Sequence, residues 1–209
     1  MNLIIFDMDG TLIDSGNVIT NTINYVRGNF GLEPMDKTII LKNLNNPDIN
    51  SAKFFYGTSE FTKEQTALFS KYYDKHCISD IVLYDGIKDL LTTLKDKYIL
   101  SVATNANEQF AHKMLEFLGI KDYFSFIAAA DMVKNPKPKP DMLHLCCKSL
   151  GINKQNVILI GDSNKDKLAA KAANIDYILV NWGFSDYGLD DDVVTKVDQL
   201  YKKIENKFK

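Results

Sequence analysis

Two spacings of apolar residues run along this chain, and they predict two kinds of element. Short unbroken apolar runs, such as Leu3–Phe6, predict buried strands. Between residues 17 and 30 the apolar side chains recur every three or four positions, which is the pattern of one helical face. These side chains are Ile19, Ile23, Val26 and Phe30. On the same grounds we predict further strands at 99–103, 126–129, 157–160 and 177–180, and further helices at 38–44, 49–56, 62–74, 87–96, 107–118, 140–150, 165–173 and 193–206.

The order of these elements predicts the fold class. After residue 84, strands alternate with helices, which is typical of a doubly wound parallel α/β sheet. Residues 15–83 show helical patterns and no convincing strand, so they interrupt the alternation after a single strand. Thr62 and Gln65 have the spacing of a capping box at the start of the last of those helices. We therefore expect an α/β core domain formed by residues 1–14 and 84–209, with an inserted all-helical cap domain at 15–83.

The composition argues against several classes of partner. The formal net charge of the 209 residues is −2, so no overall basic field is available to bind nucleic acid. No apolar run reaches the roughly 18 residues that a membrane helix needs, and the short run at the N-terminus does not have the pattern of a signal peptide. Cys77, Cys146 and Cys147 match neither a disulfide framework nor a zinc site. We expect a cytoplasmic protein with no nucleic-acid partner and no membrane partner.

Polar residues follow the ends of four of the predicted strands, within about ten positions of each strand. Because the carboxyl ends of parallel strands meet at one edge of a sheet, these residues should lie close together. Carboxylates, a hydroxyl, an amide and a lysine form a set that suits metal-assisted phosphoryl transfer. The residues are Asp7 and Asp9 after the first strand, Thr104 and Asn105 after the second, a lysine of the segment 135–140 after the third, and Asp162 and Asp166 after the fourth.

These segments resemble the four motifs of the haloacid dehalogenase-like (HAD) superfamily, in the family's order and across the whole predicted core. The insert after the first motif is similar to the helical cap of the phosphoglycolate phosphatase and β-phosphoglucomutase branch. The resemblance implies a Rossmann-like core and a Mg²⁺-dependent phosphatase that hydrolyses a small phosphorylated metabolite. The matching segments are Asp7-Met8-Asp9-Gly10-Thr11-Leu12, Thr104-Asn105, Lys137-Pro138-Lys139-Pro140-Asp141, and Gly161-Asp162-Ser163 with Asp166.

The resemblance also implies roles for the acidic residues. Asp7 matches the nucleophile, which would form an aspartyl-phosphate intermediate. Asp9 matches the general acid/base, which would protonate the leaving group and then activate water. The Mg²⁺ ligands would be the Asp7 carboxylate, the Asp9 backbone carbonyl and the Asp162 carboxylate, and Asp166 would bind through water or orient the other ligands.

The phosphate-binding residues follow from the same resemblance. Thr104, Asn105 and backbone N–H groups near Gly10 would donate hydrogen bonds to phosphoryl oxygens. Lys137 would pair with the phosphate and with Asp7. Lys134 and Lys139 are rivals for that position, and the order Lys-Pro-x-Pro favours Lys137.

The predicted cap offers a weaker set of candidates for contact with the leaving group. For any single one of them a solvated helix face or a polar turn is the favoured interpretation, and a cluster at 43–47 is the best candidate for a specificity loop. These candidates are Arg27, Lys42, Asn43, Asn45 and Asn46.

Alternative functions remain open at this point. A sugar phosphomutase of the same branch is one, although the Gly-x-Ser-Arg-type cap motif of those enzymes is missing. A non-catalytic member that binds a phosphoprotein or serves as an assembly partner is another, although Asp7, Asp9, Lys137 and Asp162 are all retained. A dehalogenase is disfavoured because those enzymes lack the carboxylate at the position of Asp9. The sequence selects neither among phosphoglycolate, sugar phosphates, nucleotides and pyrophosphate nor among oligomeric states.

Overall fold

The computed structural model of the chain, which describes residues 1–184 and 193–208, contains a six-stranded parallel sheet. The strand order is β5-β4-β1-β6-β7-β8, so the first strand lies in the middle of the sheet, with Leu3 between Ile99 and Val157. This confirms the predicted doubly wound α/β fold. The strands are β1 (Leu3–Phe6), β4 (Ile99–Thr104), β5 (Phe126–Ala129), β6 (Val157–Gly161), β7 (Asp176–Val180) and β8 (Val193–Val194).

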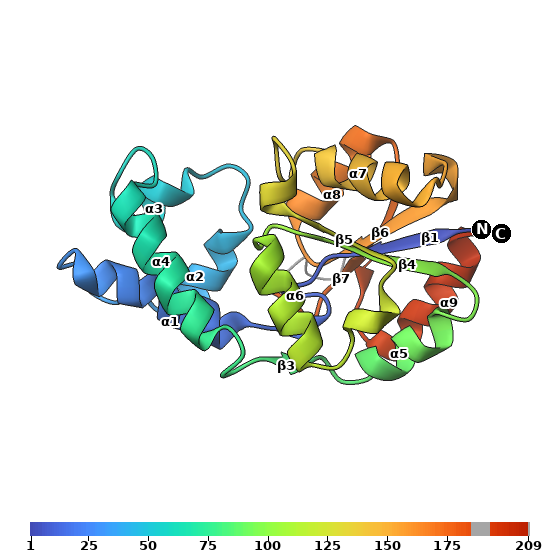
Figure 1. Cartoon of the computed structure of the whole chain (residues 1–209), viewed down its shortest axis with the longest axis horizontal. Helices are drawn as coiled ribbons and strands as arrows, with labels where there is room; N and C mark the ends of the chain where they lie inside the picture. Colours follow the sequence, from blue (N-terminus) through green and yellow to red (C-terminus); the bar gives the residue numbers. More distant parts are fainter. Residues whose placement is uncertain (185–192, 209) are drawn as a thin grey trace.

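Helices cover both faces of this sheet (Figure 1). Side chains alternate between the faces along a strand, so Leu3 and Ile5 pack on the side of α7 and α8, whereas Ile4 and Phe6 join the apolar cluster that includes α5, α6 and α9. Short 3-10 helices precede β5 and β6, and another follows β5. The helices are α5 (Ile87–Leu94), α6 (Glu108–Phe117), η1 (Lys121–Tyr123), η2 (Ala130–Met132), α7 (Asp141–Leu150), η3 (Lys154–Asn156), α8 (Asn164–Ala173) and α9 (Val197–Lys207).

Four further α-helices form a separate group beside the sheet, drawn in blue to green in Figure 1. We refer to residues 16–76 as the helical segment. The predicted capping box is present at its last helix: the Thr62 N–H donates to Gln65 Oε1 (2.9 Å), and the Gln65 N–H donates to Thr62 Oγ1 (3.1 Å). The four helices are α1 (Gly16–Asn29), α2 (Lys37–Leu44), α3 (Ser51–Tyr56) and α4 (Lys63–His76).

A small antiparallel ribbon lies where the chain enters and leaves the helical segment. It pairs β2 (Ile13–Asp14) with β3 (Val82–Leu83). The expectation that residues 15–83 contain no strand is therefore wrong at their last two positions. A two-residue strand is too short to show an alternating pattern, and its partner lies almost seventy positions away, so nothing local marks it.

The end of the chain also differs from the prediction. We predicted one helix over 193–206, but Val193 and Val194 form β8 at the edge of the sheet, and α9 begins at Val197. Two adjacent β-branched residues favour an extended strand when a partner is available, and β7 supplies that partner. Residues 185–192 and 209, which fall within the expected core range 84–209, lie outside the described residues. Among the helices described, none is both long enough and apolar enough to span a membrane.

Candidate active site

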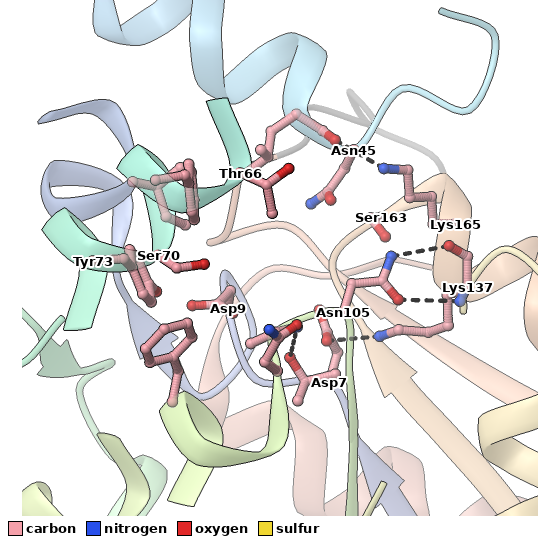
Figure 2. A pocket seen from close by; sticks show the side chains of 17 residues that line it. Asp7, Asp9, Asn45, Thr66, Ser70, Tyr73, Asn105, Lys137, Ser163 and Lys165 are labelled. Atoms are coloured by element: carbon pink, nitrogen blue, oxygen red, sulfur yellow. Dashed lines mark hydrogen bonds and ion pairs between the residues drawn. The ribbon is translucent and has the colours of Figure 1, made fainter. Parts of the chain in front are cut away.

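The carboxyl ends of the central strands come together at one edge of the sheet. Asp7 directly follows β1 and is held there by its N–H, which donates to the Ile160 carbonyl of β6 at 2.8 Å. Together with residues of the helical segment, the strand ends enclose a cavity of about 290 Å³ (Figure 2). The predicted site residues that line it are Asp7, Asp9, Asn45, Thr104, Asn105 and Lys137.

Lys137 is buried between two carboxylates. Its Nζ lies 2.7 Å from Asp7 Oδ1 and 2.6 Å from Asp166 Oδ1. Burial acts to lower the pKa of Lys137, but the charges of Asp166 and Asp7 outweigh it and raise the pKa above its ordinary value. The rivals Lys134 and Lys139 are both exposed. Lys137 is therefore the lysine that the loop delivers to the site.

Asn105 fixes the backbone of Lys137. The Lys137 N–H donates to Asn105 Oδ1 (3.1 Å), and Asn105 Nδ2 donates to the Lys137 carbonyl (2.9 Å). Thr104 is buried and accepts a hydrogen bond from the Ala106 N–H at 3.1 Å. In this structure Asn105 is thus a positioning residue for the lysine loop as well as part of the cavity wall.

Three buried carboxylates form one cluster. Asp7, Asp162 and Asp166 each place a carboxylate oxygen within 4.8 Å of the others. Burial, followed by the charge of Asp166, raises the pKa of Asp7 well above its usual value and raises that of Asp162 to about 7. One lysine does not neutralise three carboxylates, and an all-oxygen set fits a hard divalent cation such as Mg²⁺. These side chains could therefore hold a metal ion.

Close backbone packing holds Asp162 in place, and two of its neighbours are glycines. Gly10 has φ of 84°, and a Cβ there would lie 2.3 Å from Asp162 Oδ2. A Cβ on Gly183 would lie 2.1 Å from the Gly10 carbonyl oxygen. The Phe184 N–H donates to Asp162 Oδ2 at 2.7 Å. The contribution of Gly183 and Phe184 was not predicted, because only the fold brings them to the first motif.

Asp9 lies beside the cavity rather than in the acidic cluster. The Ser15 hydroxyl donates a short hydrogen bond to Asp9 Oδ1. Burial raises the pKa of Asp9, and the hydrogen bond from Ser15 opposes this shift without cancelling it. Asp9 thus has the two properties that an acid needs in a closed site: access to the cavity and a pKa shifted towards neutrality.

The start of α8 supplies another part of the site. The Asp166 N–H donates to Ser163 Oγ (3.3 Å), and the Ser163 N–H donates to Asp166 Oδ2 (3.1 Å), which closes a capping box. Ser163 also lines the cavity, although it was not among the predicted site residues. The sequence does contain a signal for Ser163, because a serine three residues before an acidic residue is the pattern of a capping box at a helix start.

The helical segment contributes its own wall to the cavity. Among the five candidates from the sequence, Asn45 lines it, whereas Arg27 donates to the backbone carbonyls of Glu33 (2.8 Å) and Phe55. Asn43 and Asn46 make hydrogen bonds within their own neighbourhood, and Lys42 is exposed. The other wall residues from this segment were not predicted, although four of them share one face of α4 at helical spacing. They are Ile19, Leu44, Thr66, Phe69, Ser70 and Tyr73.

Fold and site together place this protein among the α/β enzymes that bind a ligand at the carboxyl edge of a parallel sheet. The chain belongs to the haloacid dehalogenase-like hydrolases: the family model matches residues 4–180. This confirms the resemblance seen in the four motifs.

Individual relatives support the same assignment. The chain is 31% identical over 211 residues to a phosphoglycolate phosphatase of Chromobacterium violaceum, with 96% of this chain and 95% of the relative covered. It is 32% identical to a phosphoglycolate phosphatase of Psychrobacter arcticus, with 96% of each chain covered. Among solved structures it is similar to a predicted phosphatase from Clostridium acetobutylicum, with a TM-score of 0.86, 30% identity and 98% of both chains covered. The chain therefore lies in the phosphoglycolate-phosphatase-like branch of the family.

Proposed function

We propose that this protein is a Mg²⁺-dependent phosphatase that hydrolyses a small phosphomonoester through an aspartyl-phosphate on Asp7. The observation that carries the proposal is the position of Asp7, which lines the cavity, pairs with buried Lys137 and shares an acidic cluster with Asp162 and Asp166. The names of the relatives make 2-phosphoglycolate the first substrate to test.

In the first step, an Asp7 carboxylate oxygen attacks phosphorus while the ester oxygen leaves. Asp9, which lines the same cavity, donates a proton to the departing alkoxide. In the second step, the Asp9 carboxylate takes a proton from water, whose oxygen attacks the phosphorus of the aspartyl-phosphate. The bond to Asp7 breaks, inorganic phosphate leaves and the Asp7 carboxylate is regenerated.

The remaining core residues bind and neutralise the phosphoryl group. Lys137 would stabilise the charge that develops on the phosphoryl oxygens, and Thr104, Asn105 and backbone N–H groups near Gly10 would donate hydrogen bonds to them. Asp7, Asp162 and Asp166, with the Asp9 carbonyl, would hold Mg²⁺, which supplies charge neutralisation between the nucleophile and its anionic substrate.

We further propose that residues 15–83 act as a cap over a core of residues 1–14 and 84–209. Support comes from the cavity, because its walls come from both parts of the chain. A cap of this kind would exclude water while the phosphoryl group is transferred.

The proposal is tested by phosphate release from a panel of phosphomonoesters, with Mg²⁺ and with EDTA. We expect Mg²⁺-dependent release from the parent protein and its loss in Asp7→Asn. Asp122→Asn, which changes an exposed aspartate outside the cavity, is the matched control and should keep full activity. Circular dichroism should show the same fold for all three proteins. Near-normal turnover by Asp7→Asn would remove Asp7 as the nucleophile, and no release from any ester by the folded parent would reject the phosphatase.

A further inference from the structure

Lys165 is a second lysine in the cavity wall, and it links the two parts of the molecule. It lies in the first turn of α8, next to Asp166, and lines the cavity together with Lys137. Its ammonium donates to the carbonyl of Leu44, at the end of α2, at 2.9 Å (Figure 2). The positive charge therefore sits where the core meets the helical segment.

The environment of Lys165 differs from that of Lys137. Lys137 is held between two carboxylates, whereas Lys165 forms no ion pair within residues 1–184 and 193–208. The Leu44 carbonyl accepts from one of its three N–H donors. Lys165 is half-buried. Keeping a half-buried ammonium charged costs free energy when its hydrogen-bond partner is neutral, and a bound anion would reduce that cost.

The other residues of the cavity wall indicate which part of a substrate the Lys165 ammonium would contact. Apart from Lys137 and Lys165, no lining residue in the described part of the chain is a cation. The phosphoryl group is expected beside Asp7 and Lys137, in the core. The leaving group would then extend towards the wall from the helical segment, which carries amide, hydroxyl and apolar side chains and to which Lys165 is hydrogen-bonded.

Given the proposed phosphatase function, we propose that Lys165 binds a second anionic group on the leaving-group side of the substrate. The preferred substrates are then small phosphomonoesters that carry a carboxylate or a second phosphoryl group. The ammonium can keep its hydrogen bond to Leu44 and use its remaining N–H groups for the anion. Lys165 is in this sense a specificity-determining residue, distinct from Lys137, which serves the transferred phosphoryl group.

The experiment compares two phosphomonoesters and one phosphoanhydride of similar size that differ in the charge of the leaving group. 2-Phosphoglycolate carries a carboxylate, 2-hydroxyethyl phosphate carries a hydroxyl at the same distance, and pyrophosphate carries a second phosphoryl group. Values of kcat/KM are measured for the parent, Lys165→Met, Lys165→Arg and the control Lys167→Met. Lys167 lies on the same helix but does not line the cavity.

We expect the parent to prefer at least one substrate with an anionic leaving group over 2-hydroxyethyl phosphate. Lys165→Met should reduce that preference about tenfold or more, mainly through KM, which is the scale of one charge-assisted hydrogen bond. Lys165→Arg should retain most of the preference, and Lys167→Met should leave it unchanged. If kcat/KM falls more for 2-phosphoglycolate, Lys165 binds a carboxylate, and if it falls more for pyrophosphate, Lys165 binds a second phosphoryl group.

Two results would overturn the assignment. One is a parent protein without preference for an anionic leaving group. The other is an equal loss for all substrates in Lys165→Met, which would mean that Lys165 serves the transferred phosphoryl group or only the packing of the helical segment.

Calorimetric binding of the same compounds to Asp7→Asn, with and without Lys165→Met, separates this inference from the proposed function. A parent that turns over none of the compounds rejects the phosphatase, while the binding preference still decides the role of Lys165. A preference that persists in the Asp7→Asn, Lys165→Met double variant contradicts that role.

Discussion

Single residues carry an unusual share of the charge balance in this site. Lys137 is buried with its ammonium 2.7 Å from Asp7 and 2.6 Å from Asp166, and a third carboxylate, Asp162, completes the cluster. When one member of a buried ion pair is removed, the remaining charged group is unpaired and has no solvent to stabilise it. The same side chain thus matters both to stability and to the proposed chemistry.

Replacing Lys137 by Met should therefore affect two measurements. In EDTA, the free energy of unfolding should fall by about 3 kcal/mol, because two buried carboxylates lose their partner. Phosphate release should fall on the order of a hundredfold or more, because the developing charge loses its stabiliser. Lys139→Met, at an exposed position two residues away, is the control and should change neither. An unchanged urea midpoint for Lys137→Met would show that the ion pairs contribute no net stability.

Gly10→Ala tests the close packing of the backbone against Asp162. An alanine there would place its Cβ 2.3 Å from Asp162 Oδ2, so the carboxylate must move. We expect Mg²⁺ affinity to fall about tenfold or more. Gly57→Ala is a matched control, since Gly57 has φ of 74° but open space around its Cβ position. Both variants bear the cost of positive φ, so a loss of Mg²⁺ affinity in both would mean that general strain, rather than the contact with Asp162, is the cause.

At the scale of elements, the ends of helices and strands decide where the chemistry lies. The β6-α8 junction places Asp162 and Asp166 in the acidic cluster, and the Ser163–Asp166 capping box fixes the first turn of α8. At the other wall, α4 begins with the Thr62–Gln65 capping box and presents Thr66, Phe69, Ser70 and Tyr73 to the cavity. Capping therefore sets the register of two of the helices that bring residues to the site.

The contribution of the α4 cap can be measured directly. Thr62→Ala removes the acceptor of the Gln65 N–H and should lower the free energy of unfolding by about 1 kcal/mol. Thr93→Ala, at an exposed position in the last turn of α5, should stay within about 0.5 kcal/mol of the parent. Denaturant unfolding followed by circular dichroism gives both values. Equal stability of the two variants would show that packing against the neighbouring helices, rather than the cap, holds the start of α4.

At the scale of the whole molecule, the acidic cluster couples metal binding to folding. Asp7 lies 155 positions before Asp162 and 159 before Asp166, so it meets the other two carboxylates only in the folded state. A cation that binds this cluster binds the native protein in preference to the unfolded chain, and so stabilises it.

Mg²⁺ should therefore raise the thermal midpoint of the parent protein. At a concentration one hundred times the dissociation constant, the stabilisation should be about 2.7 kcal/mol. Asp162→Asn should lose most of this shift, whereas Asp122→Asn should keep it. Differential scanning calorimetry with Mg²⁺ and with EDTA provides the measurement, and an unchanged shift in Asp162→Asn would place the metal elsewhere.

The sequence by itself determined which segments form the longer strands and most of the helices, and which polar residues follow the strand ends. Those features follow from local spacing and from the geometry of parallel sheets, so Asp7, Asp9, Thr104 and Asn105 were predicted as neighbours. The family's Lys-Pro-x-Pro order added Lys137 to that set. Only the tertiary structure decided which side chains complete the cavity. Gly183 and Lys165 meet their partners across more than 120 residues, and the wall formed by α4 depends on how the helical segment rests on the core. Local patterns encode secondary structure, whereas such contacts depend on packing between elements that no local pattern records.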